Sequence, residues 1–424
     1  MFTNALIPML TVSLLTQPAP AERATPEKIP ADDRVRLLAH AVIPAATNDN
    51  SGLTGTMSDG QPRARLGGFG SGLAYTGVGD RFIALPDRGP QDGAVDFDCR
   101  WQELDLTLTP KKDPSTRPYD LTVSIGRTVL LQNQTARRFV GLSRAIDDGT
   151  SPLRLDPEGI RVSKTGESVF VSDEYGPTIT EFTRDGVAIR SIAVPPIFAI
   201  AKPSADAEAE ITANAAGRVA NRGFEGLAIS PDGSTLTALL QSPLIQDGGR
   251  KGLNCRVLQI DLASGTSRQL VYPLSDASLG TNEILAISAT TFLVIERDGK
   301  DGAKSKAKRI YRADFTDATD VSNIPSLPAD TLPAGVVPAK KTLILDMLDP
   351  AFGLRSAEFP EKIEALCFGP TLPNGSVVLY IVSDNDFRKD QDTHFWAFAI
   401  PASALRGDAA QIVAPPTKVN AESR

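Results

Sequence analysis

A two-segment pattern that occurs five times along this 424-residue chain limits the fold more than any other feature. Each copy opens with a short β-rich segment, passes through a turn, and returns as an apolar run that ends in polar or charged residues. Four of the five copies open with glutamate. The opening segments are residues 71–75, 158–162, 225–229, 283–287 and 364–368, and the returning segments are 82–88, 169–174, 236–241, 292–297 and 378–384. This regularity predicts a series of β-hairpins.

Turn sequences and further strands extend each hairpin. Gly-containing turns separate most of the paired segments, and alternating segments at 256–261 and 309–314 are typical of third strands. Segments at 121–125, 188–193 and 342–346 can supply fourth strands. Four strands per unit is the composition of a propeller blade. We therefore predict an all-β protein with a single β-propeller of five four-stranded blades. A ring of six blades is also compatible with the pattern, and a β-sandwich or two separate β domains is the alternative fold.

The domain organisation follows from where the pattern begins and ends. The unit starts are unevenly spaced and lie further apart than blades of about 40–50 residues, so loops must absorb the difference. The expected insertions are residues 111–120, 195–222, which could hold a helix, and 300–308. The last unit lacks a fourth strand, which residues 34–42 can supply to close the ring. We predict a signal peptide at 1–21, an N-terminal segment at 22–66, the propeller at 67–401 and a C-terminal tail at 402–424.

Charge and cysteine content exclude several classes of protein. The formal net charge is −7, which argues against a surface that binds a nucleic-acid backbone. Cys99, Cys255 and Cys367 are too few for a disulfide scaffold and lack the close spacing of a zinc site. Two alternatives follow for the cysteines: one disulfide bridge between Cys99 and Cys255, or three buried free thiols.

The N-terminus carries an export pattern. An apolar stretch from Ala5 to Leu15 is followed by Ala19-Pro20-Ala21, a small-residue pattern suited to signal peptidase. No cationic residue precedes the stretch and Pro8 interrupts it, so a disordered or anchoring N-terminus is the alternative. No later segment has the roughly 18 apolar residues that a membrane span needs. We expect an exported protein, periplasmic or secreted, with no stable membrane span in its mature form.

The acidic residues of the repeat are expected to meet. A hairpin returns the end of its second strand to the start of its first strand, and radial repetition gathers these ends at one mouth of a central channel. Carboxylates held close together take up protons or bind cations. Calcium suits such a set of oxygen ligands best, and magnesium or manganese is the alternative. The expected metal ligands are Glu158, Glu225, Glu283, Glu364, Asp173, Asp87 and Asp384, with Asp386 as a further member.

Each of these acids also has a simpler interpretation, in which it caps a turn or pairs with a nearby arginine on the surface. Recurrence in several units favours a shared site. Arg88 and Arg297 directly follow acids at the channel end, and a guanidinium can bind two phosphate oxygens. Internal salt bridges are the alternative for both.

Several motifs together resemble the esterase-like phytase family. They are Asp156-Pro-Glu158-Gly-Ile, Val171-Ser-Asp173-Glu174-Tyr-Gly, Asn221-Arg-Gly-Phe-Glu225-Gly-Leu, Gly68-Phe-Gly-Ser-Gly-Leu with Pro86-Asp87-Arg88-Gly, Ile295-Glu296-Arg297-Asp298, and Lys362-Ile-Glu364-Ala-Leu with Ser383-Asp384-Asn385-Asp386. The resemblance covers residues 67–401. It implies a β-propeller in which acidic residues carry phosphoester hydrolysis, commonly in exported bacterial proteins.

Three functional hypotheses follow. The first is a metal-dependent phosphoesterase that acts on a small phosphorylated ester, in which Glu174 or Glu296 orients water and Arg88 and Arg297 neutralise phosphate oxygens. The second is a calcium-dependent lactone or carboxyl-ester hydrolase, and the third is a metal-stabilised propeller that only binds a ligand or protein. A serine hydrolase is disfavoured, because the surroundings of Ser71 do not match a nucleophile elbow and His40 and His394 are the only histidines.

Overall fold

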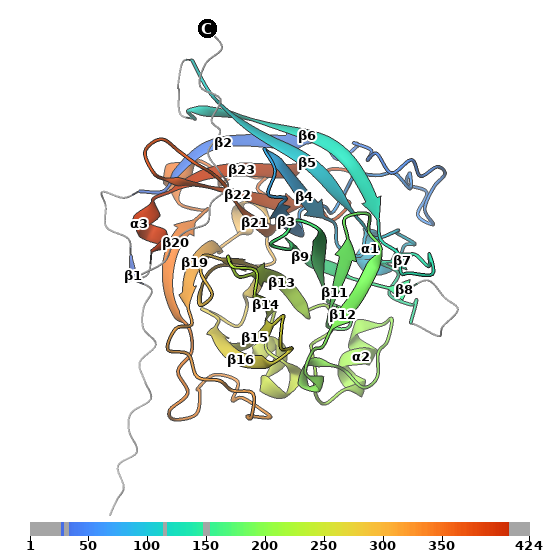
Figure 1. The fold of residues 1–424 in the computed structure, drawn as a ribbon, viewed down its shortest axis with the longest axis vertical. Coiled ribbons are helices and arrows are strands. Elements are labelled where there is room, and N and C mark those ends of the chain that lie inside the picture. The colour runs from blue at the N-terminus through green and yellow to red at the C-terminus, as the bar shows by residue number, and fades with distance from the viewer. Residues whose placement is uncertain (1–26, 29–33, 113–116, 147–152, 407–424) are drawn as a thin grey trace, which may run out of the picture.

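The chain forms a ring of five β-sheets around a central channel (Figure 1), as seen in a computed structural model that describes residues 27–28, 34–112, 117–146 and 153–406. Each sheet is one blade with four antiparallel strands, so the predicted five-bladed propeller is confirmed. The first strand of every blade lines the channel and contacts the first strands of both neighbouring blades.

The blades follow one another along the chain. Blade one holds β3 (Gly72–Tyr75), β4 (Arg81–Leu85), β5 (Arg100–Pro110) and β6 (Tyr119–Leu130). Blade two holds β9 (Pro157–Val162), β10 (Ser168–Asp173), β11 (Thr178–Thr183) and β12 (Ala188–Ile192). Blade three holds β13 (Phe224–Ile229), β14 (Thr235–Leu240), β15 (Asn254–Asp261) and β16 (Ser267–Pro273). Blade four holds β17 (Gly280–Ala286), β18 (Thr291–Arg297), β19 (Lys308–Asp314) and β20 (Lys340–Asp346). Blade five holds β21 (Lys362–Thr371), β22 (Val377–Asp384), β23 (Thr393–Ile400) and β2 (Arg36–Ile43).

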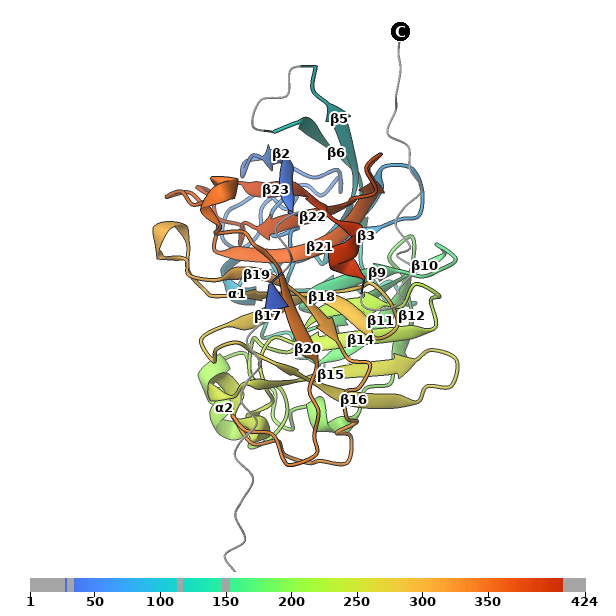
Figure 2. The same cartoon turned by 90° about the vertical axis from the view of Figure 1, so that its left-hand side faces the viewer.

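The ring is closed by a strand from the N-terminal side of the chain. Strand β2 pairs antiparallel with β23 and is the outer strand of blade five, as the sequence predicted for residues 34–42. A second N-terminal strand, β1 (Glu27–Lys28), pairs parallel with β20 at the edge of blade four (Figure 2). The chain therefore ties its first described residues to two blades formed near its end.

The core is divided among the blade interfaces. Five clusters of buried apolar side chains lie between successive blades, and each draws residues from both blades that it joins. Between blades two and three, for example, Phe170 and Ile179 pack with Phe224 and Leu227. Alternating strand residues send one set of side chains to each face, so a blade contributes to two interfaces at once. This packing holds the inner strands rigidly around the channel.

A β-bulge interrupts most inner strands at the channel mouth. The pairing of β13 with β14 skips Glu225, and the pairing of β21 with β22 skips Glu364. Strand β9 gains one residue around Glu158 and Gly159, and β17 gains one at Asn282 and Glu283. A bulge bends its strand and re-aims the extra side chain.

Close packing of the inner strands explains the glycines that follow two of these glutamates. A Cβ atom on Gly226 would lie 2.7 Å from the backbone nitrogen of Ile284, and one on Gly159 would lie 2.6 Å from that of Leu227. A larger residue would push neighbouring blades apart.

The connections match the sequence predictions only in part. The segment at 195–222 contains α2 (Ala207–Ala213), the helix that its composition allowed. The predicted insertion at 111–120 falls between β5 and β6, and residues 113–116 lie outside the described residues. Residues 300–308 contain a short 3₁₀ turn. Further short elements are α1 (Pro90–Gly93), β7 (Phe139–Val140), β8 (Leu153–Arg154) and α3 (Ala402–Leu405).

Other sequence predictions have clear outcomes or fall outside the described part. The three cysteines are buried free thiols, and the bridge between Cys99 and Cys255 is not formed. The predicted signal peptide at 1–21 and most of the tail at 402–424 lie outside the described residues. No helix within the described ranges is long and apolar enough to cross a membrane.

Candidate active site

The acidic residues of the repeat gather at one mouth of the channel, where the first strand of each blade begins and the second strand ends. Eight carboxyl groups from blades one, two, three and five lie there, and blade four contributes Asn282 and Arg297. The carboxyl groups belong to Asp87, Asp156, Glu158, Glu174, Glu225, Glu364, Asp384 and Asp386. All except the half-exposed Asp386 are buried. We call this set the acidic mouth.

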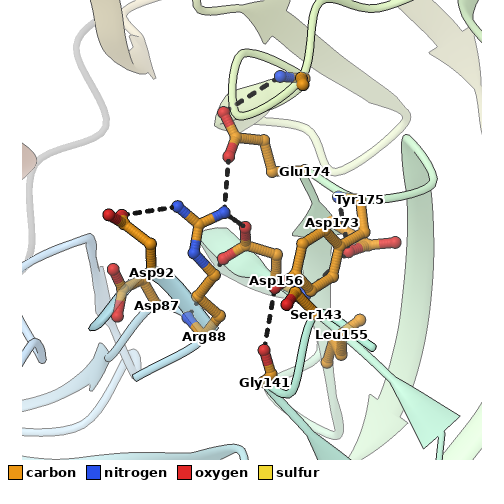
Figure 3. Close-up of polar contacts among 12 residues, drawn as sticks. Asp87, Arg88, Asp92, Gly141, Ser143, Leu155, Asp156, Asp173, Glu174 and Tyr175 are labelled. Carbon is orange, nitrogen blue, oxygen red and sulfur yellow. Dashed lines mark hydrogen bonds and ion pairs between the residues drawn. The ribbon is translucent and has the colours of Figure 1, made fainter. Parts of the chain in front are cut away.

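Arg88 is the cation of the acidic mouth that lies between blades one and two (Figure 3). Its Nη1 lies 2.7 Å from Asp156 Oδ2 and 3.8 Å from Glu174 Oε2, while Nη2 lies 3.0 Å from Asp92 Oδ1. The guanidinium also packs over the ring of Tyr175, 5.7 Å from its centroid. One donor, the Nε–H group, is buried and has no acceptor among the described residues.

Three carboxylates of blade two converge beside Arg88. Asp156, Glu158 and Glu174 each offer one oxygen, and these oxygens all lie within 4.8 Å of one another. Burial and the negative charge of Glu225 and Asp156 raise the pKa of Glu158 well above its ordinary range, and burial, Glu225 and Asp156 do the same for Glu174. Within the described residues the Glu158 carboxylate makes no hydrogen bond or ion pair. We call this set the blade-two triad.

A second group of acids lies around an ammonium group. Lys362 Nζ is 3.0 Å from Asp384 Oδ2, 2.9 Å from Asp386 Oδ1 and 3.8 Å from Asp87 Oδ2. Burial alone would lower the pKa of Lys362, but Asp384, Glu364, Asp87 and Asp386 together raise it well above its ordinary value. The lysine therefore stays charged and supplies the positive partner that this group needs.

The third group joins blades three, four and five. Glu225 Oε1 accepts hydrogen bonds from Gln241 Nε2 at 2.7 Å and from Asn282 Nδ2 at 2.6 Å. Arg297 forms an ion pair with Glu364, and its Nε–H group is buried without an acceptor in the described part of the chain. Burial and the charge of Glu364 raise the pKa of Glu225 to about 8.

Two of the predicted site residues are directed elsewhere. Glu283 Oε2 lies 2.9 Å from Arg161 Nη2, deeper in the channel, so Asn282 takes its expected place at the mouth. Glu296 accepts a hydrogen bond from the Tyr272 hydroxyl at 2.7 Å and forms an ion pair with Lys341. Successive strand residues point to opposite faces, and Arg297 faces the channel, so its neighbour Glu296 faces the adjoining blade.

Asp173 ends β10 next to the acidic mouth, but local donors occupy its carboxylate. Its carboxylate accepts from the backbone N–H groups of Asp156, Tyr175 and Gly176 at 2.9–3.1 Å and from the Thr178 hydroxyl at 3.2 Å. Burial raises its pKa to about 6, although these hydrogen bonds oppose the shift. Asp173 therefore shapes the turn that carries Glu174.

The segment before blade three also fixes Glu174. Arg218 donates to the carbonyl oxygen of Tyr175 from both Nε and Nη2, and the Gly223 N–H group donates to Glu174 Oε1 at 3.1 Å. Arg218 is in turn paired with Glu210 of α2. The α2 insertion thus buttresses the loop that bears an acid of the blade-two triad.

Sequence reasoning did not assign a role to three residues of the acidic mouth. Asp156 and Lys362 each stand two positions before a repeat glutamate, a spacing that places alternate strand residues on one face and could have indicated them. Asn282 precedes Glu283, and only the bulge in β17 reveals that it is the residue that faces its neighbours.

Comparison with known proteins identifies the family. The phytase-like family, described as the esterase-like activity of phytase, matches residues 64–387. The chain belongs to this family. Phytase-like membership agrees with the resemblance seen in the sequence motifs, and the description supports a hydrolase that acts on small-molecule esters.

Individual relatives of the phytase-like chain are distant. An uncharacterized secreted protein of Arthroderma benhamiae is 28% identical over 367 residues, which is 67% of this chain and 70% of the relative. Among solved structures, a periplasmic gluconolactonase of Pseudomonas aeruginosa is 12% identical with a TM-score of 0.34, over 91% of this chain and 99% of the other. The hydrazine synthase of Kuenenia stuttgartiensis is 13% identical with a TM-score of 0.34, over 75% and 78%.

Proposed function

We propose that this protein is a phosphoesterase that hydrolyses small phosphorylated esters at the acidic mouth with the help of a divalent cation. The observation that carries the proposal is the blade-two triad, in which Asp156 pairs with Arg88 while the Glu158 carboxylate makes no hydrogen bond or ion pair among the described residues. Family membership supports an esterase-like activity but leaves the type of ester open. A dense set of acids beside arginines is a combination suited to an anionic substrate that shares a cation with the protein.

The donor set fits a hard divalent cation. Asp156, Glu158 and Glu174 offer carboxylate oxygens, which calcium, magnesium and manganese prefer. The Lys362 group would not hold the cation, because the ammonium already fills it. When bound, the cation would neutralise negative charge that develops on the phosphoryl oxygens. Calcium is our first choice, because it tolerates irregular coordination geometry. These three acids come from a strand and from loops, which do not impose a regular arrangement.

The residues of the chain have separate roles in this proposal. Arg88 and Arg297 carry the buried Nε–H groups that lack acceptors, and these groups can donate to phosphate oxygens. Burial and the charge of Glu364 raise the pKa of the Glu225 carboxyl to about 8 in the cation-free protein, and this carboxyl can serve as the proton donor to the leaving alkoxide. Burial of the carboxyl groups lowers the local dielectric constant and strengthens each of these interactions.

A panel of esters tests the proposal. The purified protein is treated with a chelator, restored with Ca²⁺, Mg²⁺ or Mn²⁺, and assayed with p-nitrophenyl phosphate, inositol hexakisphosphate, p-nitrophenyl acetate and a δ-lactone. We expect cation-dependent release of phosphate and a roughly 100-fold or greater loss in Glu158→Gln. The exposed Glu167→Gln, in the same blade, is the matched control and should keep full activity.

Three results of the panel would contradict the proposal. Undiminished phosphate release after complete removal of divalent cations would exclude the role of the cation. Hydrolysis of only the acetate or the lactone would replace phosphoester chemistry with the carboxyl-ester alternative. No hydrolysis of any ester, together with cation-dependent thermal stabilisation, would favour a binding propeller.

We also propose that the protein is exported. The N-terminal apolar stretch and the small-residue pattern at Ala19-Pro20-Ala21 support this, and the relative from Arthroderma benhamiae is named as a secreted protein. Sequencing the N-terminus of the protein recovered from outside the cytoplasm tests it, and a mature chain that begins near residue 22 is the expected result. Recovery only from the cytoplasm with an intact N-terminus would contradict it.

A further inference from the structure

The opposite mouth of the channel holds a cavity of about 670 Å³. It lies where the first strand of each blade ends, among the turns that lead into the second strands, so the length of the inner strands separates it from the acidic mouth. This volume is in the range of pockets that enclose small ligands. The cavity has no role in the proposed function.

The lining of this cavity combines apolar walls with cations. Leu73, Val162, Ile229, Leu285 and Phe368 are among its walls, and all five blades contribute to it. Its charged residues are Arg81, Arg161, Lys164 and Arg184, and no aspartate or glutamate of the described ranges lines it. The contrast with the acidic mouth is sharp in a chain whose formal net charge is −7.

The floor of the cavity is built by Arg161. This arginine is 4% exposed and donates to the carbonyl oxygens of Leu73 at 3.0 Å and Ile284 at 2.9 Å. It also pairs with Glu283. Its Nε–H group is buried and has no acceptor in the part of the chain that the structure describes. A buried donor without a partner is costly and indicates a missing acceptor.

The rim adds both charge and apolar surface. Arg81 and Lys164 are exposed, Arg81 lies 3.6 Å from Asp105, and Lys164 donates to the Pro231 carbonyl oxygen at 3.0 Å. Val78 is 66% exposed, the most exposed large hydrophobic residue in the described chain, and it too lines the cavity. The exposed Val78 side chain therefore lies on the same rim as Arg81 and Lys164. Arg81 has only a long ion pair, and Lys164 has an uncharged acceptor.

We propose that this cavity binds an amphipathic monoanion, a carboxylate with a medium-length apolar chain. The apolar walls would take the hydrocarbon part and the basic groups would take the carboxylate. A strongly polar polyanion would leave the apolar walls uncovered. A neutral lipid would leave the Arg161 Nε–H group without an acceptor and the Lys164 ammonium without a charged partner among the described residues. The site is separate from the acidic mouth and does not depend on the activity proposed there.

Calorimetric titration with octanoate tests the proposal on the full-length protein. We expect saturable binding of one octanoate per chain, and binding at least tenfold weaker for octanol and octylammonium. In Arg81→Gln/Lys164→Gln the octanoate Kd should rise by roughly five- to tenfold, because two exposed cations each contribute a modest ion pair. Lys340→Gln/Arg388→Gln removes the same charge at exposed positions outside the cavity and should leave the Kd unchanged.

A second variant places a like charge beside the bound carboxylate. Val78→Glu places a negative group at the exposed rim, where it does not disturb the core, and should abolish measurable octanoate binding. Equal affinity for octanoate and octanol would overturn the proposal, and so would absence of saturable octanoate binding to the unmodified protein. An equal loss of octanoate affinity in Arg81→Gln/Lys164→Gln and in Lys340→Gln/Arg388→Gln would also overturn it, since the effect would then come from net charge alone.

Discussion

Lys362 Nζ lies 3.0 Å from Asp384 Oδ2, and this ammonium group occupies the centre of the acids on blade five and blade one. The side chain of Lys362 is 23% exposed and that of Asp384 is fully buried. The lysine therefore neutralises part of the acidic mouth from within the chain. Arg88 is the protein cation beside the blade-two triad, where we propose that a divalent cation also binds. The Lys362 group and the blade-two triad therefore have different cationic partners.

Removal of the lysine charge should create a second cation site. Lys362→Gln leaves Asp87, Asp384 and Asp386 without their common partner, which we expect to lower the free energy of unfolding by roughly 2–4 kcal/mol. Added Ca²⁺ should then raise the melting temperature of this variant more than that of the unmodified protein. Scanning calorimetry with and without Ca²⁺ measures both. An equal rise in melting temperature with Ca²⁺ in both proteins would show that these acids do not form a cation site even without the lysine.

The protonation of Glu225 makes stability depend on pH. Its pKa is about 8 in the folded protein against an ordinary value of 4.5, so the folded state binds the proton more tightly than the unfolded chain. The stability that results is fully present below pH 4.5 and is lost as pH rises to 8. In chelator-treated protein, the melting temperature should therefore fall from pH 5 to pH 8, and it should fall less in Glu225→Gln. Parallel curves for the two proteins would contradict the assignment.

Asp173 is expected to position the site rather than to bind the cation. Asp173→Asn retains an acceptor but loses the negative charge that three backbone N–H groups share. We expect a loss of about 1–3 kcal/mol in the free energy of unfolding. The protein should still bind one divalent cation in a calorimetric titration, with an affinity reduced by no more than about tenfold. A folded Asp173→Asn protein that binds no cation would make Asp173 a ligand.

Ser71 and the two histidines should not take part in hydrolysis. The Ser71 hydroxyl donates to the Gly68 carbonyl oxygen at 3.2 Å, and His40 and His394 bond to each other at 2.9 Å on the outer strands of blade five. Burial, followed by the charge of His394, lowers the pKa of His40 to about 4. Ser71→Ala should retain activity within about threefold, and a serine-directed inhibitor should have no effect. Complete inactivation by either would restore the serine hydrolase hypothesis.

The repeat allowed the fold and part of the acidic mouth to be predicted from the sequence. Apolar alternation and turns located the five hairpins, and the missing fourth strand of the last unit correctly indicated closure by an N-terminal strand. Glu158, Glu225 and Glu364 were found because each opens a unit. These features depend on local periodicity, which a single sequence contains.

The remaining features depend on local irregularities and on partners far along the chain. The bulge in β17 turns Glu283 toward Arg161 and brings Asn282 to the mouth, a change that a strict two-residue period cannot reveal. The pairing of Glu296 with Lys341 joins residues of two different strands and required the packed structure. That Arg297 and Glu296 face opposite sides could have been predicted from strand alternation alone.

Anomalous scattering from Mn²⁺ in crystals of the chelator-treated and reloaded protein tests the central claim most directly. We predict one strong peak coordinated by oxygens of Asp156, Glu158 and Glu174, and its loss in Glu158→Gln crystals. The absence of a peak there in the unmodified protein at saturating Mn²⁺, or a peak only among Asp87, Asp384 and Asp386, would contradict it.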